Sequence, residues 1–246
     1  MLMDNERFDD LLTHQLKIIQ SPEVFSFSLD AVLLARFCSV PASGAIADLC
    51  AGNGVIPLLL STRTKASIVG VEIQPRLWDM AVRSIAANGL QQQLRMELAD
   101  LREWAKSSAL NGAFDMVTVN PPYLPIPQGY QNENEHRALA RHEVMCTLEE
   151  VVAACSRIVR PGGKVAMVHR PSRLADVIQV MRHYRLEPKR IRFVHPRADA
   201  EANIVLIEAL RDGKPEVKLL PPLIVYEDQD RYCQELMDIF YGGVNH

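Results

Sequence analysis

The chain has 246 residues, of which 48% are hydrophobic, and this composition supplies a sizeable core and excludes a wholly disordered chain. At this length a single α/β domain is expected. No stretch approaches the ~18 uninterrupted apolar residues of a transmembrane helix, and the acidic N-terminus lacks the pattern of a secretory signal. Five scattered cysteines form no CxxC pair. We therefore expect a soluble, cytoplasmic protein that spans no membrane and holds no structural metal or disulfide framework.

The charge is unevenly distributed, although the formal net charge is only −3. Residues 157–197 hold eleven Lys or Arg and two Asp or Glu, so this basic segment carries +9 and the rest of the chain −12. Such asymmetry in a near-neutral protein suggests a face that binds a polyanion. A set of solvated helix faces would explain the charge equally well.

The hydrophobic pattern predicts helices over most of residues 4–40, with a loop near Ser21-Pro22 and a second helix at about 29–37. Strands are expected next at 46–50, 67–73, 94–98 and 114–119, with helices at 55–60 and 76–88. A helix at 147–159, a tight turn at 160–163, a strand at 164–169 and a helix at 172–183 follow. Strands at 190–195 and 203–209 and a short helix near 230–240 complete the chain. This alternation predicts a doubly wound, mostly parallel α/β sheet.

We expect three parts: an N-terminal helical segment (1–40), a main domain (41–215) and a C-terminal appendage packed on it (216–246). The 120–134 loop holds four prolines, which favours a functional role over a core element.

The turn after the first strand of the main domain has the features of a ligand site. Asp48 precedes it, and Gly52 and Gly54 allow the backbone to approach a ligand closely. A dinucleotide fingerprint would have a third glycine where Pro57 stands, so a pyrophosphate site is disfavoured.

Three further polar residues end the next three predicted strands: Glu72, Asp100 and Asn120. An acid at the first position can accept hydrogen bonds from ribose hydroxyls, and one at the second from an adenine amino group. Each alone is more often a helix cap or a surface residue. Because the carboxyl ends of parallel strands share one edge of the sheet, however, we expect the whole set to converge there.

This ordered set resembles the class I S-adenosylmethionine-dependent methyltransferases. The resemblance implies a seven-stranded, Rossmann-like sheet and S-adenosylmethionine as the cofactor. It places Asp48 and the turn of Gly52 and Gly54 near the amino-acid end of the cofactor, Glu72 at the ribose and Asp100 at the adenine, with Asn120 beside them.

Asn120-Pro121-Pro122-Tyr123 matches the (N/D)PP(Y/F) motif of methyltransferases that modify adenine N6, cytosine N4 or a glutamine side chain. These nitrogens are poor nucleophiles because their lone pairs are delocalised. The Asn120 side-chain oxygen and the Pro121 carbonyl can accept hydrogen bonds from the NH₂ group and align it for transfer. Pro122 and Tyr123 are expected to contact the substrate, with Tyr123 stacked on the planar target. We therefore assign catalysis to Asn120, Pro121 and Tyr123.

Outside this core, the chain resembles the bacterial tRNA adenine-N6 methyltransferases that modify the adenosine 3′ of the anticodon (position 37) in a valine tRNA. The resemblance is most specific at residues 19–34, 120–123 and 167–196. It implies that the N-terminal segment covers the cofactor, with contacts from Phe25, Ser28 and Asp30, and that tRNA is the partner. We expect phosphate contacts from Lys189, Arg190 and Arg192, because three cations in four residues are hard to bury. Arg170 is a further candidate for substrate contact.

Two enzymatic alternatives share the tetrapeptide: N5-methylation of a release-factor glutamine, and adenine-N6 methylation of ribosomal RNA or DNA. The glutamine methyltransferases usually carry a longer helical domain before the first motif, and here only 47 residues precede Asp48. An RNA-binding module without activity is a non-enzymatic alternative. No obligate protein partner is expected.

Overall fold

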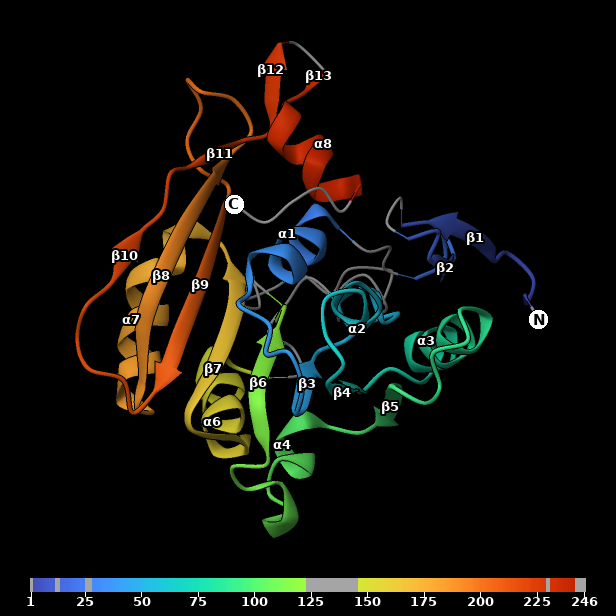
Figure 1. Cartoon of the computed structure of the whole chain (residues 1–246), viewed down its shortest axis with the longest axis horizontal. Coiled ribbons are helices and arrows are strands. Elements are labelled where there is room, and N and C mark those ends of the chain that lie inside the picture. Colours follow the sequence, from blue (N-terminus) through green and yellow to red (C-terminus); the bar gives the residue numbers. More distant parts are fainter. Residues whose placement is uncertain (1, 12–13, 25–27, 123–145, 229–230, 242–246) are drawn as a thin grey trace, which may run out of the picture.

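The computed structural model describes residues 2–11, 14–24, 28–122, 146–228 and 231–241, and its centre is a nine-stranded sheet (Figure 1). Seven longer strands follow the order β8-β9-β7-β6-β3-β4-β5, and all are parallel except β9, which is antiparallel to both neighbours. The predicted doubly wound, mostly parallel sheet is confirmed. Their bounds are β3 (Ala45–Leu49), β4 (Ser67–Glu72), β5 (Leu94–Leu98), β6 (Phe114–Val119), β7 (Val159–His169), β8 (Leu186–His195) and β9 (Ile204–Arg211).

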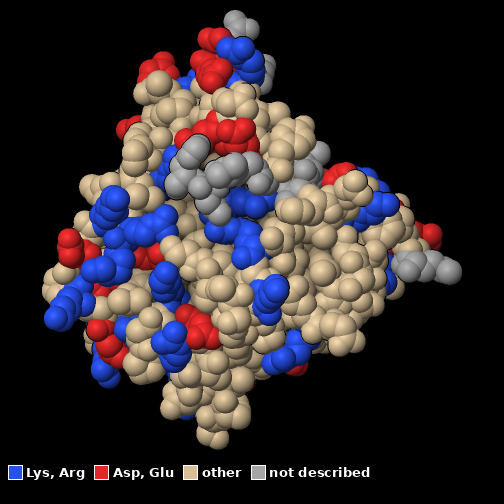
Figure 2. All heavy atoms as spheres, viewed as in Figure 1, with Lys and Arg blue, Asp and Glu red and all other residues tan. Residues whose placement is uncertain are grey.

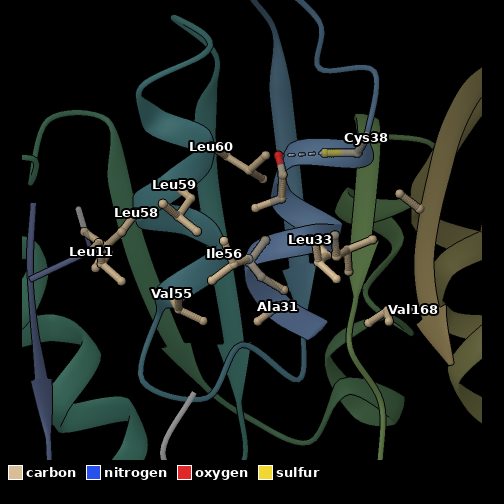
Figure 3. Packing of buried hydrophobic residues seen from close by; sticks show 14 of the residues in the cluster. Leu11, Ala31, Leu33, Cys38, Val55, Ile56, Leu58, Leu59, Leu60 and Val168 are labelled. Atoms are coloured by element: carbon tan, nitrogen blue, oxygen red, sulfur yellow. Dashed lines mark hydrogen bonds between the residues drawn. The ribbon is translucent and has the colours of Figure 1, made fainter. Parts of the chain in front are cut away.

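Helices cover both faces of this sheet because side chains of successive strand residues point to opposite sides and each side builds its own core. On one face, α1 packs against α2, and Figure 3 shows Ala31 and Leu33 of α1 on the side of α2 that carries Ile56, whereas Leu58 lies beside Leu11. The other face is covered by α4, α6 and α7. The helix bounds are α1 (Leu29–Phe37), α2 (Val55–Ser61), α3 (Pro75–Ala87), α4 (Leu101–Trp104), α6 (Leu148–Ile158) and α7 (Leu174–His183).

The N-terminal residues correct one prediction. The helix expected before Ser21 is wrong, because β1 (Arg7–Asp10) and β2 (Lys17–Gln20) form an antiparallel hairpin. Helix α3 supplies side-chain partners for β2: Ser84 Oγ accepts from the Ile19 N–H at 2.9 Å, and the Asn88 amide bonds both backbone groups of Lys17. This tertiary docking is invisible to local periodicity. The second predicted helix, α1, is confirmed.

A second correction concerns the turn predicted at 160–163. Strand β7 begins at Val159 and includes these residues, and its pairing with β6 shifts register between Phe114 and Met116. Gly162 takes a left-handed φ of 71° within this irregular stretch. The glycines that suggested a chain reversal therefore accommodate a bulge at the start of a strand.

The C-terminal residues extend the sheet and close one core. β10 (Lys218–Leu219) and β11 (Leu223–Ile224) pair in parallel with β8. β12 (Tyr226–Asp228) and β13 (Arg231–Tyr232) form a small ribbon before α8 (Gln234–Tyr241). Leu236 of α8 is fully buried in the same core as the α1 side chains. Among the helices in the described ranges, none combines the length and apolarity needed to cross a bilayer.

Candidate functional site

Asp48 and Thr118 are neighbours on β3 and β6, and both side chains are completely buried. The Thr118 hydroxyl donates to Asp48 Oδ1 at 2.6 Å. The other oxygen, Asp48 Oδ2, is buried without a hydrogen-bond partner in the described part of the chain. Burial raises the pKa of Asp48 from 3.8 to about 8, against the opposing effect of the Thr118 hydrogen bond. The site thus contains a buried carboxyl group with one oxygen held by Thr118 and the other without a partner among the described residues.

The turn that follows has three left-handed residues: Cys50 (φ 58°), Gly52 (φ 57°) and Gly54 (φ 86°). The two glycines serve different purposes. A Cβ on Gly52 would meet no atom within 4 Å, so its side faces open space, whereas a Cβ on Gly54 would lie 3.1 Å from the Ala81 Cβ on α3. Gly52 therefore leaves room for a ligand, and Gly54 allows α3 to pack closely against the turn.

Glu72 ends β4 and holds the turn in place. Its carboxylate accepts from the Gly52 and Gln74 backbone N–H groups, each at 2.8 Å. Burial raises the pKa of Glu72, and these backbone hydrogen bonds oppose the rise. Asp48, Gly52 and Glu72 are brought together as predicted, and the two carboxyl groups are close enough for Glu72 to raise the pKa of Asp48.

Asp100 lies beside this group, since the Ala99 N–H bonds the Glu72 carbonyl. Its own carboxylate caps α4, accepting from the Arg102 N–H at 2.9 Å, and forms an ion pair with the Arg102 guanidinium at 2.6 Å. These contacts lower the pKa of Asp100. Asp100 therefore has the helix-cap role that the sequence left open. Any hydrogen bond that it accepted from a ligand would be made by a carboxylate already bonded to Arg102.

The predicted catalytic residues directly follow β6, whose last residue, Val119, pairs with Leu49 on β3. Asn120 is half-buried, Pro121 buried and Pro122 half-buried. Asn120 therefore lies at the same edge of the sheet as Cys50, because each directly follows one residue of the Val119–Leu49 pair. Tyr123 and Phe25 lie outside the described residues. Ser28 occupies the N-cap position of α1 and Asp30 its first turn, and both are half-buried.

Two residues of this region were missed by sequence analysis. Thr118 interrupts an apolar strand, which is the one signal that could have identified it. Asn53 lies between the two glycines, is 3% exposed and donates from Nδ2 to the Ile19 carbonyl at 3.1 Å. This bond joins the turn to the N-terminal hairpin, so Asn53 connects two segments that are remote in sequence.

The basic segment differs from its prediction. Figure 2 shows Lys and Arg side chains gathered near the β8 side of the molecule with acidic side chains among them. Within the described ranges, ion pairs are seen for six of its eleven cations: Arg160–Asp115, Arg173–Asp176, Arg182–Glu187, Arg185–Asp212, Arg190–Glu208 and Arg192–Glu235.

Lys189, Arg190 and Arg192 were expected to resist burial, but Arg190 and Arg192 are partly buried. The Arg192 side chain is 19% exposed and bonds Glu235 at 2.6 Å. Arg190 is 31% exposed and contacts Glu208, Ser39 and the Phe37 ring. Both arginines bind carboxylates of other elements, Glu208 on β9 and Glu235 on α8. Lys189 Nζ bonds the Lys214 carbonyl, and the exposed Arg170 bonds the Asn203 carbonyl after the end of β7.

No group of three His, Cys, Asp or Glu side chains suited to a metal ion occurs within the described ranges. The site is instead built from buried carboxyl groups, a glycine turn and an Asn-Pro-Pro segment at one edge of a parallel sheet.

Comparison with known proteins shows that residues 15–184 match the family model of the methyltransferase small domain. A curated relative from Porphyromonas gingivalis, named tRNA1(Val) (adenine(37)-N6)-methyltransferase, is 28% identical over 79% of this chain and 78% of its own length. A crystal structure described as a predicted O-methyltransferase from Agrobacterium tumefaciens has a TM-score of 0.71, with 22% identity over 89% of this chain and 98% of that one. Geranyl diphosphate C-methyltransferase from Streptomyces coelicolor, solved with S-adenosyl-L-homocysteine, has a TM-score of 0.56, with 14% identity over 74% and 79%. Because this family model covers most of the chain, the chain belongs to the methyltransferase small domain family.

Proposed function

We propose that this protein transfers a methyl group from S-adenosylmethionine to the exocyclic N6 of an adenine in tRNA, at the adenosine 3′ of the anticodon (position 37) of a valine tRNA. The observation that carries the proposal is the Asn120-Pro121-Pro122 segment at the end of β6, beside the turn that Asp48 and Glu72 flank. The curated relative described above has this activity in its name. A tRNA substrate also implies that the protein acts in the cytoplasm.

The residues around the turn fit S-adenosylmethionine. Gly52 leaves open space, and the unpartnered Asp48 Oδ2 can accept from the cationic amino group of the methionine part. Glu72 already orders the Gly52 backbone, and its carboxylate oxygens have lone pairs left to accept from ribose hydroxyls. The positively charged sulfur of the bound cofactor makes its methyl group electrophilic, so the residues of the chain need only position the nucleophile.

Asn120 and Pro121 are the residues we assign to that positioning. The Asn120 side-chain oxygen and the Pro121 carbonyl oxygen accept the two hydrogens of the adenine amino group. This orients the nitrogen lone pair toward the methyl group and stabilises the positive charge that develops on nitrogen. Pro121 is buried, so its carbonyl is held by the surrounding core. Tyr123 is assigned to stacking on the adenine, and Pro122 to contact with its edge.

For the tRNA backbone, Arg170 is the best-placed cation, because it follows the end of β7 and is exposed at the sheet edge that carries Asn120. Lys189 is a second candidate. Arg190 and Arg192 would have to leave their ion pairs with Glu208 and Glu235 to bind phosphate.

The test is methyl transfer from radiolabelled S-adenosylmethionine to unmodified bulk tRNA, followed by nucleoside analysis and mapping of the labelled tRNA. We expect label in N6-methyladenosine of a valine tRNA. Asn120→Ala should lower the rate by about 10²- to 10³-fold, as for loss of a positioning hydrogen bond, with cofactor affinity nearly unchanged. Label in a release factor, ribosomal RNA or DNA, and none in tRNA, would refute the proposed substrate. Full activity of Asn120→Ala would refute the role of Asn120.

A further inference from the structure

Packing alone does not explain why position 118 is a threonine. Thr118 is flanked in β6 by Val117 and Val119, and all three side chains are completely buried. Valine has nearly the shape of threonine and would avoid burying a hydroxyl, so packing alone would favour it. The hydroxyl is used instead to fix one oxygen of a buried acid at 2.6 Å.

The surroundings of Asp48 make its ionised form unfavourable in the protein without a ligand. The titratable groups that interact with Asp48 in the described part of the chain are themselves acids: Glu72 on β4, Cys50 in the turn and Cys155 on α6. None of them can neutralise a carboxylate. Asp48 Oδ2 also lacks a hydrogen-bond partner among the residues that the structure describes. A buried carboxyl group in such a place keeps its proton unless a cation arrives.

Thr118 controls which oxygen is available to that cation. Because its hydroxyl donates to Oδ1, Oδ2 is the oxygen left for the proton or for a ligand. A carboxyl group without this bond would be free to rotate about its Cβ–Cγ bond, and binding a ligand would then have to order it.

We propose that Thr118 is a positioning residue that presents Asp48 Oδ2 to the α-ammonium group of the cofactor, so that cofactor binding expels the Asp48 proton to solvent. This inference rests on the proposed function, which supplies the cofactor. In the exchange, the Oδ2–H bond breaks, the proton leaves to water, and the ammonium group keeps its own protons and pairs with the resulting carboxylate. Thr118 remains the donor to Oδ1 throughout.

The experiment is titration calorimetry with S-adenosyl-L-homocysteine, which carries the same α-ammonium group, in buffers of different ionisation enthalpy. Near neutral pH we expect the wild type to release close to one proton per ligand, and this number should fall as the pH rises through about 8, the pKa of Asp48. Asp48→Asn should release none. Thr118→Val should bind the ligand about tenfold more weakly, and Thr118→Ser should restore the affinity.

A second ligand separates positioning from a general effect on folding. 5′-Methylthioadenosine has the adenosine part but no amino-acid group, so Thr118→Val should bind it as the wild type does, with no proton released. In steady-state assays Thr118→Val should raise KM for S-adenosylmethionine and leave kcat nearly unchanged. Equal loss of affinity for both ligands would show a structural role and overturn the proposal.

Two further outcomes distinguish this inference from the proposed function. If the wild type binds S-adenosyl-L-homocysteine without releasing a proton, or Thr118→Val binds it normally, the inference about Thr118 fails while the cofactor assignment stands. If the wild type binds neither adenosine ligand, the proposed function itself fails.

Discussion

The glycine turn and the basic segment differ in whether their charged side chains have partners of opposite charge. Around the glycine turn, the buried carboxyls of Asp48 and Glu72 interact with other acids, and Asp48 Oδ2 has no partner among the described residues. In the basic segment, by contrast, arginines such as Arg190 and Arg192 are paired with carboxylates of the chain. A cluster of charge in sequence therefore does not identify a binding surface. The better guide is a polar atom that the fold has buried and left without a partner.

The largest effect that tests this contrast is the contribution of Asp48 to the pH dependence of the free energy of unfolding. Asp48 titrates at 3.8 in an unfolded chain and at about 8 in the fold, so between these values the folded state holds a proton that the unfolded state lacks. Wild-type stability should therefore fall as pH rises through this window, by up to about 1.4 kcal/mol per pH unit from this group. Asp48→Asn should remove most of that slope in urea unfolding measured without cofactor.

Asp115→Asn is the matched control, because bonds from the Ala45 N–H and the Arg160 guanidinium lower the pKa of Asp115. Its stabilising contribution has the opposite sign: it is present above the usual 3.8 and is lost as pH falls. If Asp48→Asn has the same pH slope as the wild type, Asp48 is ionised in the fold and the contrast is wrong.

Arg190→Ala tests the paired side of the comparison. It leaves Glu208, which is only 3% exposed, with hydrogen bonds from Ser39 but without a cation. We expect a loss of about 1–2 kcal/mol, smaller than for a fully buried pair because Arg190 is 31% exposed. A double-mutant cycle with Glu208→Gln should show coupling. Weaker tRNA binding with unchanged stability would instead assign Arg190 to phosphate contact.

The two glycines sharpen the contrast within the turn itself. Gly52→Ala should cost about 1 kcal/mol of stability for its left-handed φ, and its methyl group should lower cofactor affinity by projecting into the open space. Gly54→Ala has the same strain and also crowds Ala81, so it should lose more stability. Thermal unfolding and S-adenosyl-L-homocysteine binding should be measured for both. Normal ligand affinity in Gly52→Ala would mean that the ligand does not occupy the space beside Gly52.

The smallest effect is expected for Lys189→Ala. Among the described residues, the Lys189 side chain donates only to the Lys214 carbonyl. The free energy of unfolding should therefore change by less than about 0.5 kcal/mol. If Lys189 contacts phosphate, the slope of log affinity for tRNA against log salt should fall by about 1. Lys65→Ala is the control, since Lys65 precedes β4 at the opposite edge of the sheet. Identical slopes in wild type and Lys189→Ala would remove Lys189 from the interface.

The sequence by itself determined the α/β fold, the succession of its main strands along the chain and the convergence of Asp48, Gly52 and Glu72 with Asn120 at one edge. These features follow from local periodicity and from the rule that parallel strands end on the same side, so no tertiary detail was needed. The Asn-Pro-Pro-Tyr tetrapeptide could suggest a chemistry from sequence alone because its four residues are contiguous.

The tertiary structure alone decided the contacts between segments that are far apart in the chain. The N-terminal hairpin forms where α3 offers Ser84 and Asn88 to its backbone. Glu208 and Glu235 meet Arg190 and Arg192 across 18 and 43 residues. Thr118 reaches Asp48 across 70 residues. Whether a charged or polar group is free depends on which partner the fold brings beside it, and that partner leaves no mark in the local sequence.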